Sequence, residues 1–343
     1  MKNKRLPIWA LILIDVLGAA LCLGIVVLTV YVIPRGTAVQ EQETETVQQF
    51  ALPDGGSGQI SADSNNNVFS GTSQNAWSHT VTGTIAASQE EINAFYDTKK
   101  TRKTIQQDKT DTYSLTIEQV SCTIADQPLE YFIADIYVTS VQNIKTAFAN
   151  DMYGQNIRAS VRTMAQKHNA VLAISGDSYG ESEQTCVIRN GQLYSEDPGT
   201  SDVCVLYQDG TMKTYHASEF DAQTVLNNGA WQAWTFGPSL LDENGQPNSA
   251  FYTTEYINKV NPRAAIGYVA PGHYKLVIVD GRQDDYSTGV TISQLAALMH
   301  EEGCTTAYNL DGGKTAVMIY DGDSVNHPIG GGRAISDCIY LGG

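Results

Sequence analysis

The sequence predicts an α+β domain of mixed, largely antiparallel sheets with flanking helices, preceded by one N-terminal transmembrane helix and a flexible stalk. Short apolar or alternating segments recur along the C-terminal two thirds, several joined by Asn-Gly or Asp-Gly, which is typical of β-hairpins. Capped helical segments are fewer and lie between these strands. The 343 residues, 42% of them hydrophobic, suffice for one large or two small globular domains.

The N-terminal region divides into three segments. Residues 1–7, with Lys2, Lys4 and Arg5, are predicted to be a cytoplasmic tail, and residues 8–33 are apolar except for Asp15. This run is long for a cleaved signal peptide and lacks an obvious cleavage site, so we predict a retained signal anchor. The basic flank then places the remainder outside the cytoplasm, as a single-pass protein of the cell membrane.

Residues 34–83 are rich in Gln, Glu, Thr, Ser, Asn and Gly, a composition that buries too little apolar surface to fold. We therefore predict a disordered linker there and an extracytoplasmic domain over residues 84–343. The formal net charge of −16 argues against nucleic acid as a partner, because binding to phosphates requires a cationic surface.

Five of the six cysteines lie outside the apolar run. Cys186–Cys204 and Cys304–Cys338 are plausible disulfides in an extracytoplasmic protein, and buried thiols are the open alternative. No spacing typical of a zinc or calcium site occurs, so no metal and no cofactor are predicted.

The elements expected in the domain follow in chain order. Ser88 and Glu91 form a capping-box pattern at the start of a short helix. Alternation predicts strands over residues 111–120 and 131–139, helices are expected over 143–148 and 155–168, and a buried strand is expected over 170–174. Hairpin turns are predicted at Asn190-Gly191, Asp209-Gly210 and Asn244-Gly245. Strands over 264–269 and 274–279, a helix from Thr291 to about Glu302, strands flanking residues 309–313 and a last strand over 335–341 complete the domain.

Polar residues and glycines gather where the apolar strands end. Asp177, Asp280 and Asp311 each follow such a strand, and glycines beside them allow close approach of a ligand to the backbone. If these strand ends converge, the three carboxylates share one cleft with Arg263, Arg282 and Arg333.

Several of these segments resemble, in their order and spacing, the phosphodiester glycosidase family. They are NPRAAIG (261–267), VDGR (279–282), the helix over 292–302, NLDGG (309–313) and GGRAIS (331–336), and FGPSLLDENGQ (236–246) is also similar. The resemblance spans roughly residues 171–341 and implies a hydrolase of sugar-1-phosphodiesters, as in the lysosomal member that removes N-acetylglucosamine from a mannose-6-phosphate diester. It also implies a role in cell-envelope or exopolysaccharide metabolism, as in the naming of many bacterial members. The chain departs from the family at residues 175–179, where Asn-Gly-Gly and aromatic residues are common, and at Lys314.

The chemistry of such a substrate requires a carboxylate and a phosphate-binding cation. Phosphate monoester is a good leaving group, so a carboxylate acting as base, nucleophile or charge stabiliser matters more than a strong acid. Asp311 is the first choice for this role, followed by Asp280 and Asp177, and an arginine fork suits the phosphate. The predicted substrate-binding residues are Asn309, Arg263, Arg282, Arg333, Gly312, Gly313, Gly237, Ser175 and Gly176.

Two other functions are compatible with the sequence. Residues 176–180 match G-x-S-x-G, so Ser178 would be the nucleophile of a serine esterase if an α-helix followed directly. The second alternative is a non-catalytic module that binds envelope glycans in the same cleft.

Overall fold

The computed structural model describes residues 8–28, 33–39, 48–53, 84–181 and 184–343. The six-stranded sheet has the order β17-β15-β16-β5-β4-β3, and its neighbouring strands are antiparallel. Its strands are β3 (Thr101–Lys109), β4 (Tyr113–Ile124), β5 (Gln127–Val138), β15 (Arg263–Ala270), β16 (His273–Val279) and β17 (Thr306–Leu310).

Two five-stranded sheets pack with it. One has the order β19-β18-β8-β20-β6 and consists of β6 (Ile144–Phe148), β8 (Ala170–Ser175), β18 (Met318–Tyr320), β19 (Asp323–Ser324) and β20 (Asp337–Gly342). The other has the order β10-β9-β13-β11-β12 and consists of β9 (Cys186–Arg189), β10 (Gln192–Glu196), β11 (Val203–Tyr207), β12 (Met212–Tyr215) and β13 (Ala230–Trp234). The prediction of an α+β domain with largely antiparallel sheets is confirmed.

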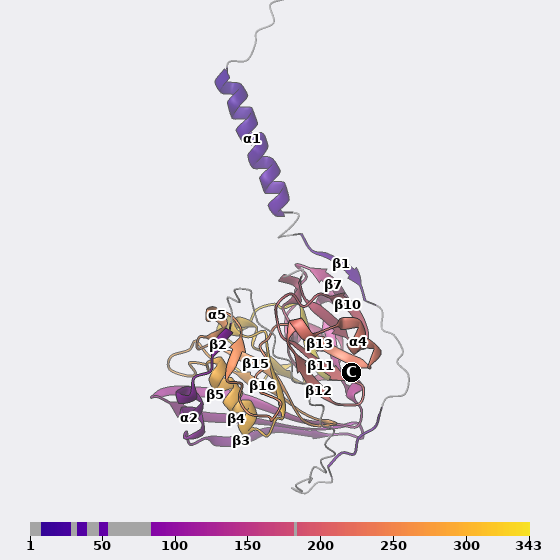
Figure 1. Cartoon of the computed structure of the whole chain (residues 1–343), viewed down its shortest axis with the longest axis vertical. Coiled ribbons are helices and arrows are strands. Elements are labelled where there is room, and N and C mark those ends of the chain that lie inside the picture. The colour runs from indigo at the N-terminus through magenta and orange to yellow at the C-terminus, as the bar shows by residue number, and fades with distance from the viewer. Residues whose placement is uncertain (1–7, 29–32, 40–47, 54–83, 182–183) are drawn as a thin grey trace, which may run out of the picture.

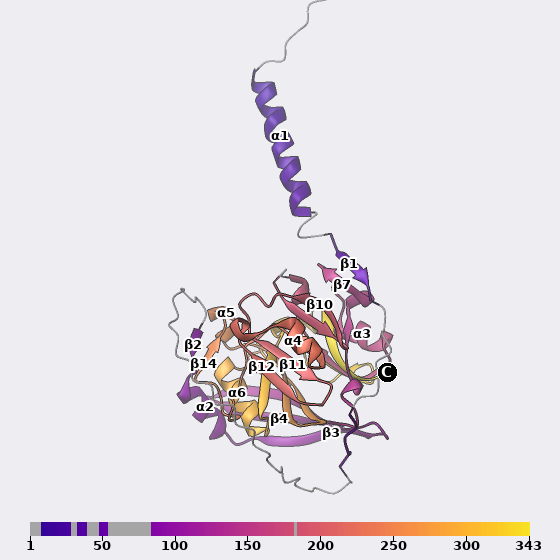
Figure 2. The same cartoon turned by 45° about the vertical axis from the view of Figure 1, so that its right-hand side comes forward.

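The central core lies among the three sheets. Ile136, Ile174 and Trp234, one from each sheet, are fully buried in the same apolar cluster. Helices cover the outer faces: α2 (Gln89–Tyr96) and α6 (Ile292–Glu301) lie side by side on the six-stranded sheet (Figure 2). In the same way α3 (Val161–Lys167) covers the sheet containing β8, and α4 (Ala222–Asn227) covers the sheet containing β9. Each sheet therefore has a helix on the face opposite the central core.

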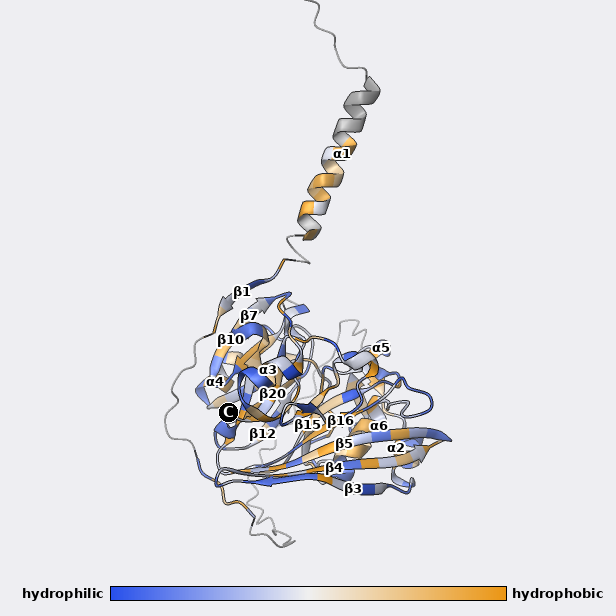
Figure 3. Cartoon of the chain, turned by 180° about the vertical axis from the view of Figure 1, so that it is seen from behind, coloured by the Kyte–Doolittle hydropathy of each residue, from blue (hydrophilic) through white to orange (hydrophobic). Residues whose placement is uncertain are grey.

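The edge strand β3 is polar, as its colour in Figure 3 shows, and most of its residues are exposed. Such a strand resists pairing with another sheet. The remaining short elements are β2 (Thr84–Ala86), which pairs with β14 (Ala250–Tyr252), α5 (Glu255–Asn258), and 3-10 turns at Val141–Asn143, Ala149–Asp151, Tyr179–Glu181, Ala217–Glu219, Gly313–Thr315 and Ile329–Gly331.

The predicted anchor segment contains α1 (Ile8–Val27), which stands apart from the sheets in Figure 1. Among the residues that the structure describes, no helix has both the length and the apolar character needed to cross a membrane. The transmembrane helix predicted over 8–33 is therefore not confirmed, and the predicted tail at 1–7 lies outside the described residues.

Parts of the predicted linker contact the domain. β1 (Arg35–Ala38) pairs with β7 (Met152–Gln155), and the amide of Phe50 donates to the carbonyl of Thr139 at 2.6 Å. The Phe50 ring approaches Gly210 and Gly272 so closely that a side chain at either glycine would collide with it. These two stretches belong to the domain surface, whereas residues 40–47 and 54–83 lie outside the described residues.

Several local predictions need correction. Residues 144–148 form strand β6 instead of a helix, because this segment pairs with β20 along its length. The helix predicted over 155–168 begins only at its N-cap Ser160, and Asn244-Gly245 forms a turn flanked by a single bridge instead of two strands. The two suggested disulfides are absent: all six cysteines are free, and four of them are buried. The alternative of buried thiols is thus the correct one for Cys186, Cys204, Cys304 and Cys338.

Candidate functional site

The NLDGG segment carries the chain from one sheet to another. β17 ends at Leu310 in the six-stranded sheet, and β18 begins at Met318 in the sheet that contains β8. Leu310 packs in the central core, while the amide of Asp311 donates to the carbonyl of Gly176 at 3.0 Å. The segment is therefore a strand end that joins two sheets, and no hairpin connects β17 to β18.

The end of β8 meets this crossover. A Cβ atom at Gly176 would lie 2.2 Å from Oδ1 of Asp337, so only glycine fits there. The same Asp337 oxygen accepts a hydrogen bond from the amide of Asp177 at 2.6 Å. The carboxylate of Asp337 thus fixes the backbone to which Asp311 is bonded.

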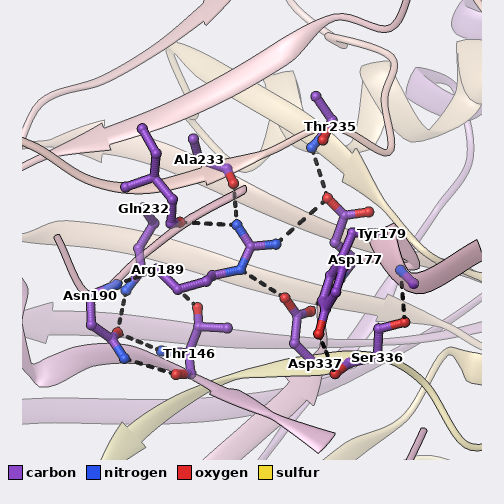
Figure 4. Close-up of polar contacts among 12 residues, drawn as sticks. Thr146, Asp177, Tyr179, Arg189, Asn190, Gln232, Ala233, Thr235, Ser336 and Asp337 are labelled. Atoms are coloured by element: carbon purple, nitrogen blue, oxygen red, sulfur yellow. Dashed lines mark hydrogen bonds and ion pairs between the residues drawn. The ribbon is translucent and has the colours of Figure 1, made fainter. Parts of the chain in front are cut away.

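Asp177 belongs to a buried network of charges (Figure 4). Nε of Arg189 donates to Oδ2 of Asp337 at 2.7 Å, and Nη2 of Arg189 lies 3.7 Å from Oδ2 of Asp177. The amide of Thr235 donates to that same Asp177 oxygen at 2.8 Å. Burial, together with the neighbouring Asp337 carboxylate, raises the pKa of Asp177, and Arg189 opposes this shift. One buried arginine thus neutralises only one of two buried carboxylates.

Asp311 lies beside this network and has the most perturbed environment among the three predicted carboxylates. Burial raises the pKa of Asp311 to about 7, and nearby Glu181 and Asp177 add to the shift, whereas Thr315 and Arg333 oppose it. Nη2 of Arg333 lies 3.9 Å from the Asp311 carboxylate, and the Arg333 side chain is 52% exposed. A carboxyl group of this pKa changes its charge near neutral pH, which is the property required of a general base.

Asn309 and Ser175 leave buried polar atoms without partners. Nδ2 of Asn309 donates to the carbonyl of Gly237 at 2.6 Å, which joins β17 to the FGPS segment. Oδ1 of Asn309 and Oγ of Ser175 have no hydrogen-bond partner among the described residues. Buried polar atoms without a hydrogen-bond partner are uncommon in folded proteins.

Arg282 lies beside Gly313 of the NLDGG segment. Its Nε and Nη2 donate to Oδ1 of Asn261 at 3.2 and 2.6 Å, and Nη2 also donates to the hydroxyl of Tyr256 at 3.3 Å. A side chain at Gly313, which has φ 64°, would point at the guanidinium, 3.5 Å from Nη1. Nη1 has no hydrogen-bond partner in the described part of the chain, so it is free to bind an anion next to Gly313.

At Gly312, close packing against another backbone segment requires glycine. A Cβ atom there would lie 2.6 Å from the carbonyl oxygen of Pro262, which also accepts a hydrogen bond from Gly313. The NPR motif and the NLDGG segment therefore touch through their backbones, and side chains at this junction are excluded by packing.

Two of the predicted site residues, Arg263 and Asp280, use their side chains for hydrogen bonds inside the protein. Arg263 is 3% exposed and donates to the carbonyls of Val290, Ile257 and Lys259, and burial lowers its pKa to about 9. Asp280 is 1% exposed and accepts hydrogen bonds from three groups: the Asn326 side chain, the His327 amide and the Tyr286 hydroxyl. The structure therefore brings together Asp311, Asp177, Asn309, Arg282, Arg333 and the glycines, and it uses Arg263 and Asp280 to hold loops.

The serine-esterase arrangement is not formed. Ser178 is followed by the 3-10 turn Tyr179–Glu181 instead of the α-helix that a nucleophile elbow requires.

A separate cavity of about 560 Å³ is lined by Asp202, His216 and Ser239 among others, and neither Asp311 nor Arg282 lines it.

Sequence reasoning missed the residues that position the site. Arg189 and Asp337 carry the buried network, and Asn261 orients Arg282, yet each resembles an ordinary turn or strand residue in the sequence. Asn261 stands in the NPR motif, which was the available signal. Arg189 lies just before a hairpin turn, where a solvated cation is the usual expectation.

Comparisons with known proteins show which proteins this chain is similar to. Residues 168–342 match the phosphodiester glycosidase family. The chain is 30% identical over 196 residues to the SPbeta prophage-derived uncharacterized protein YomE of Bacillus subtilis, covering 55% of this chain and 30% of that protein. It is 24% identical over 191 residues to the N-acetylglucosamine-1-phosphodiester alpha-N-acetylglucosaminidase of Mus musculus, covering 51% of this chain and 36% of the mouse protein. The matched region thus spans about a third of these relatives.

A solved structure shows the same fold. The catalytic domain of the zebrafish N-acetylglucosamine-1-phosphodiester alpha-N-acetylglucosaminidase, auto-inhibited by its pro-peptide, superposes with a TM-score of 0.55 at 17% identity. The superposition covers 75% of this chain and 94% of the zebrafish chain. The similarity therefore extends beyond the matched C-terminal half to most of the domain.

Proposed function

Because the chain belongs to the phosphodiester glycosidase family, we propose that it hydrolyses the bond between a sugar C1 and the phosphate of a sugar-1-phosphodiester. The mouse relative is named for N-acetylglucosamine-1-phosphodiesters, so an N-acetylglucosamine-1-phosphodiester of an envelope or exopolysaccharide glycan is the proposed substrate. The observation that carries the proposal is a buried Asp311 carboxyl group of raised pKa that lies 3.9 Å from the half-exposed Arg333, in a segment whose Gly313 lies beside Arg282.

The two arginines suit the phosphate. Nη1 of Arg282 is unbonded above Gly313, and its guanidinium is held in place by Asn261. Arg333 lies on the Asp311 side, with half of its side chain exposed. A guanidinium held in a fixed orientation binds phosphate with little loss of entropy, which favours Arg282 as the main anion ligand.

In the proposed reaction, Asp311 acts as a general base. Its carboxylate takes a proton from a water molecule as the water oxygen forms a bond to C1 of the sugar. The bond from C1 to the phosphate oxygen breaks with its electron pair, so a phosphate monoester leaves and Arg282 stabilises its charge. The products are the free sugar and the phosphate monoester, and the leaving group needs no protonation by the protein.

A panel of sugar-1-phosphodiesters incubated with the purified domain tests this function. We expect release of sugar and phosphate monoester by the wild-type protein. In the Asp311→Asn variant we expect a loss of at least 100-fold in kcat/KM, since general-base catalysis typically contributes 10²–10⁴-fold. Binding of the diesters without any product would instead identify a non-catalytic glycan-binding module, and near-normal activity of Asp311→Asn would exclude the assigned base.

We also propose that the domain acts outside the cytoplasm. The support is the order of the N-terminal residues, in which Lys2, Lys4 and Arg5 precede the apolar run from Ile8 to Ile33.

A further inference from the structure

A second cavity lies where β12, in the sheet that contains β9, meets β17 of the six-stranded sheet. Its volume is about 560 Å³, and sites for small molecules usually measure about 300–1,000 Å³. The FGPS segment and the stretch that contains β14 complete its walls. The cavity is therefore large enough for a small-molecule ligand, and the proposed function does not use it.

A buried carboxylate lines this cavity and orients an exposed histidine. Oδ2 of Asp202 accepts a hydrogen bond from the amide of Ser239 at 3.0 Å, and Oδ1 lies 2.8 Å from Nδ1 of His216. The His216 side chain is 67% exposed, and its Nε2 has no hydrogen-bond partner in the described part of the chain. Asp202 thus holds the imidazole in place and leaves one ring nitrogen for a ligand.

This pair lacks the nucleophile that a hydrolytic triad requires. The hydroxyl of Ser239 is bonded to the hydroxyl of Thr214 at 3.0 Å and to the carbonyl of Leu241 at 3.3 Å. No hydrogen bond joins Ser239 to the imidazole of His216, although the structure describes both residues. The pair is therefore arranged to bind a ligand, because a triad needs a serine within hydrogen-bond reach of the histidine.

The charges around the cavity disfavour an anion. Its lining carries two basic side chains against four carboxylates: Lys213 and His216, and Asp202, Glu219, Asp242 and Glu243. Because like charges repel, a phosphate group binds poorly here. Among the described residues, no three His, Cys, Asp or Glu side chains gather as ligands for a metal ion. The cavity is therefore best matched by an uncharged ligand.

The other lining groups match the surface of a sugar ring. Tyr252 contributes an aromatic ring, and Thr214, Ser249 and Thr306 contribute hydroxyls, which can both donate and accept hydrogen bonds. A pyranose presents C–H groups on its faces and hydroxyls around its rim. An aromatic ring can pack against such a face while polar groups bind the rim.

We propose that this cavity is an accessory binding site for an uncharged sugar residue, separate from the candidate catalytic site at Asp311. The choice of a sugar rests on the proposed function, in which the substrate is part of a glycan. The FGPS segment connects the two places, because Ser239 lines the cavity and the carbonyl of Gly237 accepts a hydrogen bond from Asn309. The accessory site holds an uncharged unit of the glycan while the phosphodiester lies elsewhere.

Calorimetry on the purified full chain tests the site with uncharged disaccharides of N-acetylglucosamine, glucose, galactose and mannose. We expect at least one of them to bind the wild-type protein. Tyr252→Ala and His216→Ala should each weaken that binding by roughly fivefold, as the loss of one aromatic contact or one hydrogen bond does. Added inorganic phosphate should leave the affinity unchanged, because phosphate does not enter the cavity.

His168→Ala is the matched control. Its ring also lies 2.8 Å from a carboxylate, that of Asp151, but it does not line the cavity, so the affinity should stay as in the wild type. His216→Ala changes an exposed side chain, so it decides the test if Tyr252→Ala fails to fold.

Three results would overturn the accessory site: no disaccharide binds, binding survives both Tyr252→Ala and His216→Ala, or phosphate displaces the sugar. The proposed function is judged separately by hydrolysis of sugar-1-phosphodiesters. If no diester is hydrolysed, that function fails, whereas the calorimetry still decides whether the cavity binds a sugar.

Discussion

Asp311 illustrates how burial changes the chemistry of one residue. Its carboxyl group has a pKa near 7 in the folded protein, well above the ordinary value of 3.8, and burial is the main cause. The folded state therefore retains a proton between these two pH values that the unfolded chain has already released. Folding stability falls as the pH rises through this window, and the loss is complete above about pH 7.

The Asp311→Asn variant should remove this pH dependence. We expect its melting temperature to match that of the wild-type protein near pH 4 and to exceed it by roughly ten degrees at pH 8. Thermal unfolding across that range measures the difference, with Asp323→Asn as control because the Asp323 side chain is 96% exposed. A constant difference between variant and wild type at all pH values would show that the Asp311 carboxyl is not perturbed by folding.

At the scale of an element, the loop from α5 to the NPR motif contacts two arginines, Arg263 and Arg282, for which the sequence predicts the same role. Both were predicted to bind phosphate. Arg263 is buried and bonded to three backbone carbonyls, whereas Arg282 is exposed, with one nitrogen of its fork unbonded. We therefore expect Arg263 to stabilise the loop and Arg282 to bind the phosphate of the proposed substrate.

Lysine substitutions should distinguish these roles. Arg263→Lys loses the planar fork inside a buried site, and we expect it to destabilise the protein by roughly 2 kcal/mol. Arg282→Lys should leave the melting temperature within about 1 °C, because exposed substitutions cost little, and should weaken turnover or diester binding about tenfold or more. Unchanged stability of Arg263→Lys together with lost binding would reverse the assignment.

At the scale of the whole molecule, three sheets converge on the site. The crossover at Asp311 joins the six-stranded sheet to the sheet of β8, and Thr235, directly after β13 of the third sheet, bonds to Asp177. All six cysteines are free, and no disulfide contributes to this arrangement. Packing of the sheets against one another therefore positions the polar residues.

The location of the molecule is open to a direct experiment. Protease added to intact cells or protoplasts should remove the domain if, as we propose, the basic residues before the apolar run direct the remainder outward. A cytoplasmic marker protein in the same cells reports leakage. Full protection of the domain while the marker also stays intact would contradict an extracytoplasmic location.

The sequence by itself determined the local features. Alternation predicted β4 and β5, an Asn-Gly pair predicted the turn between β9 and β10, and the segment from Thr291 to Glu302 predicted α6, because each depends on residues a few positions apart. It also placed polar residues and glycines at the ends of strands, among them Asp177, Asp280 and Asp311.

Only the tertiary structure decided which of those polar residues are bonded within the fold and which keep free polar groups. Asp177 is bonded to Asp337 across 160 positions, and Arg282 to Asn261 across 21. Residues 144–148 became a strand because β20 lies beside them, against a local pattern that favoured a helix. Burial and partners separate Arg263 from Arg282 and Asp280 from Asp311, and both properties arise from contacts between distant segments. The local sequence around an arginine does not show whether its side chain binds a carbonyl inside the fold or an anion outside it.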